Sequence, residues 1–326
     1  MREAVIGFDT SNYRSSVAVV TLEGEILYQF RELLSVPEGE RGLRQSDAVF
    51  AHVRNLQAAW EPLRAVLRET RPVALAASVR PRDPEDSYMP VFHVGKTMAG
   101  LLAATLDVPC FETTHQRGHL AAAARGTELE EAERFLALHL SGGTTDLLRV
   151  ERDGIEPLGG SLDLHAGQLV DRVGVALGLG FPSGPELEKL AERGSGEGRL
   201  GCSMAEGDLC CHFSGAEAQA LRWVRDGEVP REQIAREVYD LLARTIARML
   251  CAGSAGTGLR RALVTGGVAS SELFRSLLRD RLRKRRGAPE VCFGAPELSG
   301  DNAVGVALTG LRALRESKST KGREDR

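Results

Sequence analysis

Residues 135–150 read FLALHLSGGTTDLLRV, and this stretch decides which fold the chain can adopt. An apolar run, a tight turn of small residues from Gly142 to Thr145 and a second apolar run predict a strand, a turn and a strand. Glycine turns that follow strands let backbone N–H groups approach a phosphate closely. A single turn of this kind is also an ordinary hairpin corner, so its meaning depends on whether the pattern recurs.

The pattern does recur. Residues 5–31 predict three short strands joined by turns, and Gly266-Gly267 directly follows an apolar strand at residues 262–265. Three such turns in one chain predict a nucleotide held between two lobes. Apolar spacing further predicts helices over residues 47–68, 94–106 and 270–286, and a buried strand over residues 73–78.

The composition is that of an ordinary globular protein. The chain has 326 residues, 42% hydrophobic and 27% charged, which provides a sizeable core and predicts two lobes rather than one. A net charge of −3 excludes a whole-molecule field that would attract nucleic acid or membrane. Six scattered cysteines without a C-x-x-C pair, no signal-peptide pattern and no apolar run of membrane length predict a cytoplasmic protein with free thiols.

Positive charge is concentrated in one run. Residues 279–286 read RDRLRKRR, and Arg41 and Arg44 form a second, smaller cluster. Such a run is commonly the solvated face of a helix, and it is also the kind of local patch through which an acidic protein contacts RNA phosphates. Both interpretations stay open on the sequence alone.

A histidine pair lies in CFETTHQRGHL, residues 110–120, just before a run of helix formers. The i, i+4 spacing puts His115 and His119 on one face of a helix, where they can bind one metal ion. Two histidines can equally pack, one ring against the core and the other in solvent. The pair lacks the adjacent glutamate of H-E-x-x-H, the general base for peptide hydrolysis, so a metalloprotease is disfavoured.

Seven stretches follow one another along the chain: IGFDTSNYRSSVAVV, VGKTMAGLLAATLDVPCFETTHQRGHLAAA, LHLSGGTTDLL, GGSLDLHAGQLVDRVGVALGLGFPSGPELEKLA, HFSGAEAQA, VTGGVASSELFR and LSGDNAVGVAL. Together they resemble the TsaD-type tRNA threonylcarbamoyltransferases, also called the glycoprotease-like family. The resemblance covers residues 1 to about 312. It implies the α/β, two-lobed ASKHA (actin-like ATPase) fold, with mixed sheets flanked by helices and a ligand cleft between the lobes.

The resemblance also divides the chain. It implies a first lobe of residues 1–111 plus about 303–326 and a second lobe of residues 112–302. The polar composition of residues 316–326 predicts a disordered C-terminal tail.

A metal site is implied by the same resemblance. His115 and His119 would be two ligands, and Asp301 of SGDNAVG would be the third. A His-His-Asp set leaves coordination positions open, as a catalytic divalent metal such as iron or zinc requires. The metal would act as a Lewis acid on the carbonyl of a carbamoyl-adenylate.

A site for ATP or an adenylate is implied as well. Backbone amides would lie along the ligand, and the Asp171 carboxylate would accept hydrogen bonds from the ribose hydroxyls. Asp9, Ser11 and Asp163 are implied as catalytic residues. The set implied for the nucleotide is His139, Leu140, Ser141, Gly142, Gly143, Asp171, Gly184, Gly266, Gly267 and Ser271.

The implied function is transfer of threonylcarbamoyl from its adenylate to adenosine in tRNA, assisted by a smaller TsaB-like paralogue and a TsaE-like ATPase. Several positions depart from the family pattern: Thr144 replaces the histidine of S-G-G-H-T, Ser271 an asparagine and Gln168 a glutamate, and Asn12-Tyr13-Arg14 occupies a loop that is usually acidic. Metal ligands are kept while substrate-facing positions change. Two alternatives therefore stay open, a divergent paralogue with another carbamoyl acceptor and a non-catalytic nucleotide-binding partner subunit.

Overall fold

The structure is a computed structural model that describes residues 1–35, 43–152, 154–300 and 302–324. Its contacts divide the chain into two compact units, Met1–Ala123 with Gly300–Arg326, and Ala124–Ser299. This division places the histidine pair in the first unit, whereas the boundary expected at residue 112 would place it in the second lobe. No helix of the described residues is long and apolar enough to cross a membrane.

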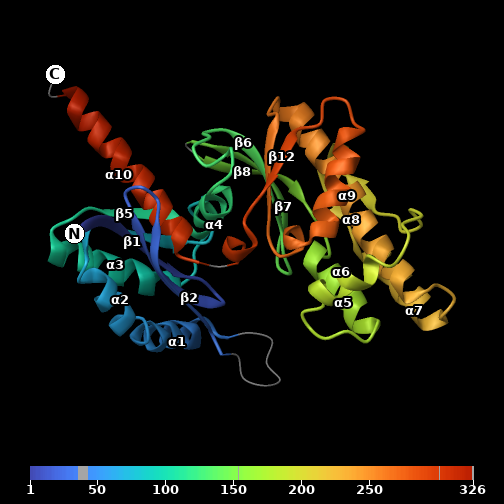
Figure 1. The fold of residues 1–326 in the computed structure, drawn as a ribbon, viewed down its shortest axis with the longest axis horizontal. Coiled ribbons are helices and arrows are strands. Elements are labelled where there is room, and N and C mark those ends of the chain that lie inside the picture. Colours follow the sequence, from blue (N-terminus) through green and yellow to red (C-terminus); the bar gives the residue numbers. More distant parts are fainter. Residues whose placement is uncertain (36–42, 153, 301, 325–326) are drawn as a thin grey trace. The chain divides into compact units, whose positions relative to one another are not determined.

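The first unit is built on a five-stranded sheet of order β3-β2-β1-β4-β5. Figure 1 labels β1, β2 and β5 of this sheet. Strand β1 pairs antiparallel with β2 and parallel with β4, so its carboxyl end lies at the same edge as those of β4 and β5. The apolar runs bury both faces of β1, which confirms the predicted opening strands. The strands are β1 (Arg2–Thr10), β2 (Arg14–Thr21), β3 (Ile26–Leu33), β4 (Thr70–Arg80) and β5 (Cys110–Thr114).

Helices cover both faces of this sheet. Leu56, Val94 and Ala103 pack with β1, β2 and β4 on one face, and Leu311 and Leu314 pack on the other. The helices are α1 (Gln45–Gln57), α2 (Trp60–Leu67), α3 (Phe92–Leu106), α4 (His115–Ala124) and α10 (Val304–Glu324).

Two helices differ from the sequence prediction. The helix expected over residues 47–68 is broken into α1 and α2, because Pro62 has no N–H to donate and its ring would clash with the preceding turn of a continuous helix. Helix α10 continues to Glu324, through most of the tail predicted to be disordered. The buried start of α10 nucleates a helix, and the good helix formers Arg, Lys and Glu that follow can propagate it.

The second unit repeats the topology of the first. Its sheet has the order β12-β11-β6-β7-β8, with β6, β7 and β8 antiparallel and β6, β11 and β12 parallel. The repeat in element order that the sequence showed is thus a repeat of sheet topology. The strands are β6 (Phe135–Leu140), β7 (Thr145–Glu151), β8 (Gly154–Gly160), β11 (Arg261–Thr265) and β12 (Glu290–Phe293), with a separate hairpin of β9 (Ser203–Ala205) and β10 (Cys210–His212).

A long helix forms the centre of the second unit. Helix α8 (Arg231–Thr257) is buried along most of its length and packs with α5, α6 and α9. The other helices are α5 (Ala166–Ala176), α6 (Gly184–Ala191), α7 (Ser214–Asp226) and α9 (Glu272–Arg283), with short 3-10 turns η1 (Glu206–Asp208), η2 (Val268–Ser270) and η3 (Pro296–Leu298). All six cysteines are free thiols, as predicted.

Candidate functional site

The two histidines of the HQRGH motif face each other at the start of α4. The Nε2 atoms of His115 and His119 lie 2.9 Å apart, and the two rings meet nearly edge to face. Phe92 of α3 borders the pair on the His115 side. The structure therefore rejects the alternative in which one ring packs in the core while the other points away from it.

Asp9, at the carboxyl end of β1, orients the pair. Both carboxylate oxygens of Asp9 lie 3.0 Å from His115 Nδ1, and the Asp9 side chain is almost completely buried. The Ser78 hydroxyl, at the end of β4, donates a short hydrogen bond to Asp9 Oδ1. Ser78 was missed by the sequence analysis, although a serine near the end of an otherwise apolar strand is a signal for such a role.

The chemistry of these atoms fits a metal ion. His115 Nδ1 contacts a carboxylate and its Nε2 atom points toward His119, and a carboxylate on one ring nitrogen is the arrangement that orients a metal-binding histidine. Two imidazole nitrogens that bind one ion at about 2.0–2.1 Å lie about 3.4 Å apart at a tetrahedral angle and about 2.9 Å apart at the octahedral angle of about 90°. The observed separation of 2.9 Å is compatible with that geometry.

The pair supplies two ligands, and a third is needed for an open catalytic site. Within the described parts of the chain, no three His, Cys, Asp or Glu side chains form a group that could hold a metal ion. Asp301, the predicted third ligand, lies outside the described residues. Its neighbour Asn302 caps α10, and a Cβ at Gly305 of α10 would collide with the backbone of Gly118, which lies between the two histidines in sequence.

Ser11, which is also implied as catalytic, starts the turn between β1 and β2. The Ser11 N–H donates to Arg14 O at 3.2 Å, and the Ser11 side chain is buried. Behind this turn the Ser15 hydroxyl pairs with His52 Nδ1 at 2.8 Å, in a fully buried contact that the sequence analysis missed. In the loop where the family usually has an acidic residue, this chain has a turn that contains Arg14. The Arg14 side chain lies beside Gly300.

In the second unit the two glycine turns lie side by side. Strands β6 and β11 are parallel neighbours, with His139 opposite Thr265, so Ser141–Gly143 and Gly266-Gly267 leave the same edge of the sheet. Gly266 has a φ of 102°, and a Cβ there would lie 2.2 Å from Leu140 O. The close approach of the turns therefore requires glycine at position 266.

The turn after β6 is open on its outer side. Gly142 and Gly143 are exposed and have empty space where a Cβ would be, while Gly167 N donates to Ser141 O and ties the turn to the start of α5. An opening of this kind lets a ligand approach the peptide backbone. Carboxyl edges of parallel strands are the usual ligand sites of open α/β sheets.

Asp171 and Gly184 are brought together through Ser183. Asp171 Oδ1 accepts a hydrogen bond from Ser183 N at 2.8 Å, and the buried Tyr239 hydroxyl donates to Gly184 O at 3.0 Å. Burial raises the pKa of the Tyr239 hydroxyl, so it remains a donor. Asp171 is only half-buried, and one of its oxygens holds the loop that leads into α6.

Ser271 and Asp163 have structural partners of their own. Ser271 is buried and caps α9, its hydroxyl accepting from Phe274 N at 3.1 Å. Asp163 receives hydrogen bonds from the Ser214 hydroxyl and from the N–H groups of Phe213 and Ser214. Burial opposes ionisation of Asp163, but these hydrogen bonds lower its pKa to about 2, so the side chain is a carboxylate anchored to the start of α7.

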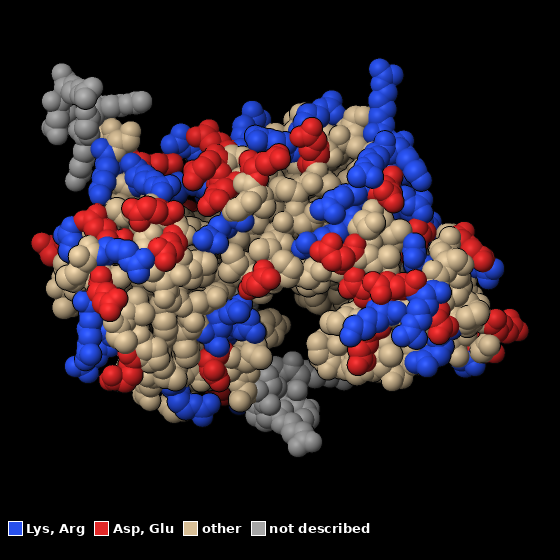
Figure 2. Space-filling view, viewed as in Figure 1, with Lys and Arg blue, Asp and Glu red and all other residues tan. Residues whose placement is uncertain are grey.

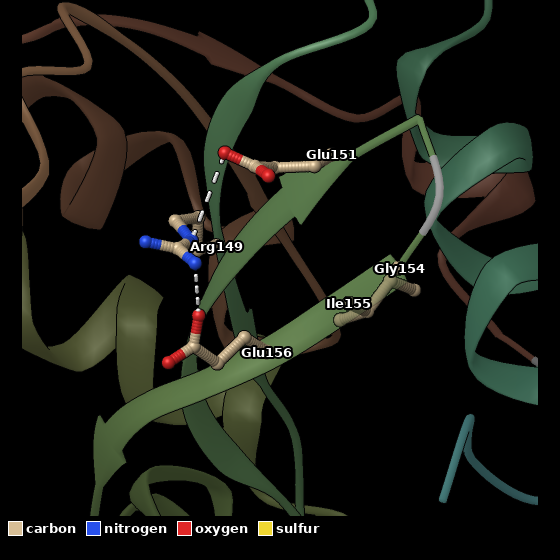
Figure 3. A pocket seen from close by; sticks show the side chains of 5 residues that line it. All are labelled: Arg149, Glu151, Gly154, Ile155 and Glu156. Carbon is tan, nitrogen blue, oxygen red and sulfur yellow. Dashed lines mark ion pairs between the residues drawn. The ribbon is translucent and has the colours of Figure 1, made fainter.

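One surface hollow lies away from all these residues (Figure 3). It is lined by Arg149, Glu151, Gly154, Ile155 and Glu156, at the end of β7 opposite to the glycine turn. Arg149 is paired with both Glu151 and Glu156, so its charge is already compensated. The hollow is therefore unsuited to a nucleotide phosphate.

Comparison with known proteins identifies similar chains. The model of the family "tRNA N6-adenosine threonylcarbamoyltransferase" matches residues 89–308. A protein of that name from Methanopyrus kandleri is 30% identical over 94% of this chain and 86% of its own length. Another from Aromatoleum aromaticum is 37% identical over 71% of this chain and 68% of its own.

A solved structure shares the fold. HypF from T. kodakarensis superposes with a TM-score of 0.60 at 15% identity, covering 96% of this chain and 48% of the larger protein. This chain thus spans about half the length of that HypF. The shared architecture and the doubled sheet topology confirm the predicted ASKHA fold class.

Proposed function

We propose a function from the following premise: this chain belongs to the family of tRNA N6-adenosine threonylcarbamoyltransferases, a family of transferases. The proposed reaction is transfer of a threonylcarbamoyl group from its adenylate to adenosine in tRNA. One divalent metal ion, iron or zinc, would assist it. The proposal rests on the contact between the Nε2 atoms of His115 and His119. The Asp9 carboxylate, which lies against Nδ1 of His115, holds that ring in place.

His115 and His119 would hold the metal ion through their Nε2 atoms, with Asp301 proposed as the third ligand. When bound, the ion supplies a Lewis acid for a carbamoyl carbonyl. Asp9 is then a positioning residue, because it holds the His115 proton on Nδ1 and so keeps Nε2 available. Ser78 fixes the rotamer of Asp9 in turn.

The donor would bind in the second unit, at the edge where the two glycine turns meet. Backbone groups of residues 139–143 and 266–267 would approach the adenylate phosphate, and Asp171 would accept hydrogen bonds from the ribose. Asp171 Oδ1 already accepts one hydrogen bond from Ser183, and its other oxygen is the one proposed for the ribose. Ser11 and Asp163 remain proposed members of the site, Asp163 through its hold on the start of α7.

A second candidate function is transfer of a carbamoyl group to an acceptor other than tRNA, and Ser271 favours it. Where the family has an asparagine, this shorter side chain is buried and caps α9, so it cannot offer the amide's paired donor and acceptor to a base. Thr144 likewise replaces a histidine. Both changes concern substrate contacts, whereas His115 and His119 are kept.

Reconstitution tests the reaction. The purified chain, a TsaB-like paralogue, a TsaE-like ATPase, threonylcarbamoyl-adenylate and tRNA should yield modified adenosine, detected by mass spectrometry of tRNA nucleosides. Unmodified adenosine in the presence of bound metal would exclude the tRNA reaction and leave the other acceptor. Deleting the gene together with any other family copy, and each alone, shows whether the same product forms in the cell.

Metal binding has a test that is independent of activity. Elemental analysis should find one metal ion per chain, lost in His115→Ala and His119→Ala. Asp9→Asn should bind the ion about 10–100-fold more weakly, because an amide no longer fixes the His115 tautomer. His93→Ala, on the exposed side of α3, is the matched control. Equal metal content in all four variants would refute the site.

A further inference from the structure

We infer that one corner of the second unit is a docking surface for the sugar-phosphate backbone of the RNA substrate. The inference rests on the proposed function, because it takes tRNA as the partner. The surface, called the basic corner, consists of six exposed cations: Arg260, Arg261, Arg283, Lys284, Arg285 and Arg286.

The basic corner is assembled from two segments that are distant in sequence. Arg260 Nη1 donates to Gly287 O at 2.8 Å, which joins the start of β11 to the turn after α9. Arg261 lies opposite Glu290 in the parallel pairing of β11 with β12. The cations from the start of β11 therefore adjoin those at the end of α9.

The structure separates these cations from the rest of the run in residues 279–286. Arg281 pairs with the buried Asp240, and Arg279 stacks on the ring of Phe293. Lys284 and Arg286, by contrast, are exposed and have no carboxylate partner among the described residues. Arg41 of the second predicted cluster lies outside the described residues.

The local charge is strongly positive. Against the six cations stand three acidic side chains: Asp280, which pairs with Arg283, Glu290, and Glu128, which acts on Cys292 together with Arg261. Six positive and three negative charges leave a net charge of +3. The whole chain has a net charge of −3, so the charge of the corner has the opposite sign to that of the whole molecule. Figure 2 shows Lys and Arg side chains gathered over this part of the second unit.

A structural explanation covers only part of the cluster. Cations at the end of a helix are stabilised by the helix dipole, which accounts for Arg283 and its neighbours in the last turn. It does not account for Arg260 and Arg261, which reach the corner from the start of β11 and add to its excess of positive charge. A phosphate backbone supplies the missing negative charge.

The basic corner lies at the opposite edge of the sheet from the glycine turns. Arg261 begins β11 and Gly266 follows its end, so the strand separates them by about 15 Å at about 3.3 Å per residue. An RNA that places its reacting adenosine near the glycine turns must therefore extend well beyond that nucleotide to reach the corner. Whole tRNA does so, and a dinucleotide that contains the adenosine does not.

The experiment compares two double charge reversals of equal net change. Lys284→Glu/Arg286→Glu changes the corner, and Arg222→Glu/Arg225→Glu changes exposed cations of α7 in the same unit. Equilibrium binding of whole tRNA and of a dinucleotide that contains the adenosine is measured across a salt series. Far-UV circular dichroism and melting curves show that both variants fold.

We expect the corner variant to bind whole tRNA about tenfold more weakly and to flatten the log–log salt slope by about 1.5–2. Binding of whole tRNA to the control variant and of the dinucleotide to the corner variant should change less than twofold. Equal losses in both variants, no loss in the corner variant, or tighter binding to phosphatidylserine vesicles than to tRNA would overturn the inference. Because the binding measurement does not require turnover, it tests the docking surface even if the proposed reaction does not occur.

Discussion

His52 is a buried imidazole within the first unit, and its chemistry is set by its neighbours. The Ser15 hydroxyl lies 2.8 Å from its Nδ1 atom, behind the turn that contains Ser11. Burial lowers the pKa of His52 to about 4, although a hydrogen bond from the ring to the Ser11 backbone and the charge of Asp9 act in the opposite direction. The ring is therefore neutral in the folded protein at pH 7. A proton on it would weaken the support of the β1–β2 turn.

The stability of the protein should consequently depend on pH through His52. Its pKa is lower in the folded chain than the ordinary 6.5, so the stabilisation is complete above pH 6.5 and is lost as the pH falls toward 4. Between pH 7 and 4.5 we expect His52 to account for about 2 kcal/mol of lost unfolding free energy. His52→Asn keeps a polar partner for Ser15 and should flatten this dependence in urea denaturation.

His93→Asn is the control for that change, since His93 is exposed on α3 and its replacement should leave the pH dependence unaltered. An unchanged pH dependence in His52→Asn would show that other groups cause the acid sensitivity.

At the scale of elements, the start of α9 joins two parts of the candidate site. Ser271 caps the helix through Phe274 N, and Glu188 of α6 accepts from Leu273 N at 2.8 Å. These contacts satisfy backbone N–H groups that the first helical turn leaves without partners. They also attach α6, which begins at Gly184, to the helix that follows the Gly266-Gly267 turn.

Ser271→Ala should lower the free energy of unfolding by about 1 kcal/mol through loss of the cap. Ser271→Asn, which restores the family residue, should retain most of the stability because asparagine is also a good capping residue. Urea denaturation gives both values, with Ser276→Ala, an exposed position within α9, as the control. A loss in Ser271→Ala no larger than that of the control would contradict the capping role.

At the scale of the whole molecule, the two halves of the proposed chemistry reside in different compact units. The histidine pair and Asp9 belong to the first unit, and the glycine turns with Asp171 belong to the second. Each unit has its own five-stranded sheet and its own hydrophobic core. A ligand that binds one unit stabilises that unit by mass action.

Hydrogen exchange should therefore distinguish the two ligands. Zinc or ferrous ion added to metal-free protein should slow exchange mainly in residues 1–123, around β1 and α4. AMP should slow exchange mainly in residues 124–299, around the ends of β6 and β11, and Asp171→Asn should reduce that effect. The reverse distribution, with AMP protecting β1 and α4 alone, would refute the assignment of the adenylate to the second unit.

Much of the fold was predictable because patterns of a few neighbouring residues specify its strands and turns. The apolar, β-branched runs of residues 5–31 specify strands by themselves, and the glycine after β11 is required by its own backbone conformation. The order of motifs was enough to predict the family and the ASKHA fold, both of which are confirmed. Pro62 also indicates the break between α1 and α2, but the predicted helix over residues 47–68 did not take it into account. Helix α8, the centre of the second core, was not predicted at all.

Only the tertiary structure decided what the motif residues touch. The spacing of His115 and His119 predicted a common face, but Asp9 is 106 residues from His115, and only the pairing of β1 with β4, and of β4 with β5, brings them together. The basic corner likewise depends on Arg260 meeting Gly287. Periodicity and turn chemistry act over a few residues and can be read locally. Contacts between distant segments follow from how the sheets register and the helices pack, and that is set by the whole chain.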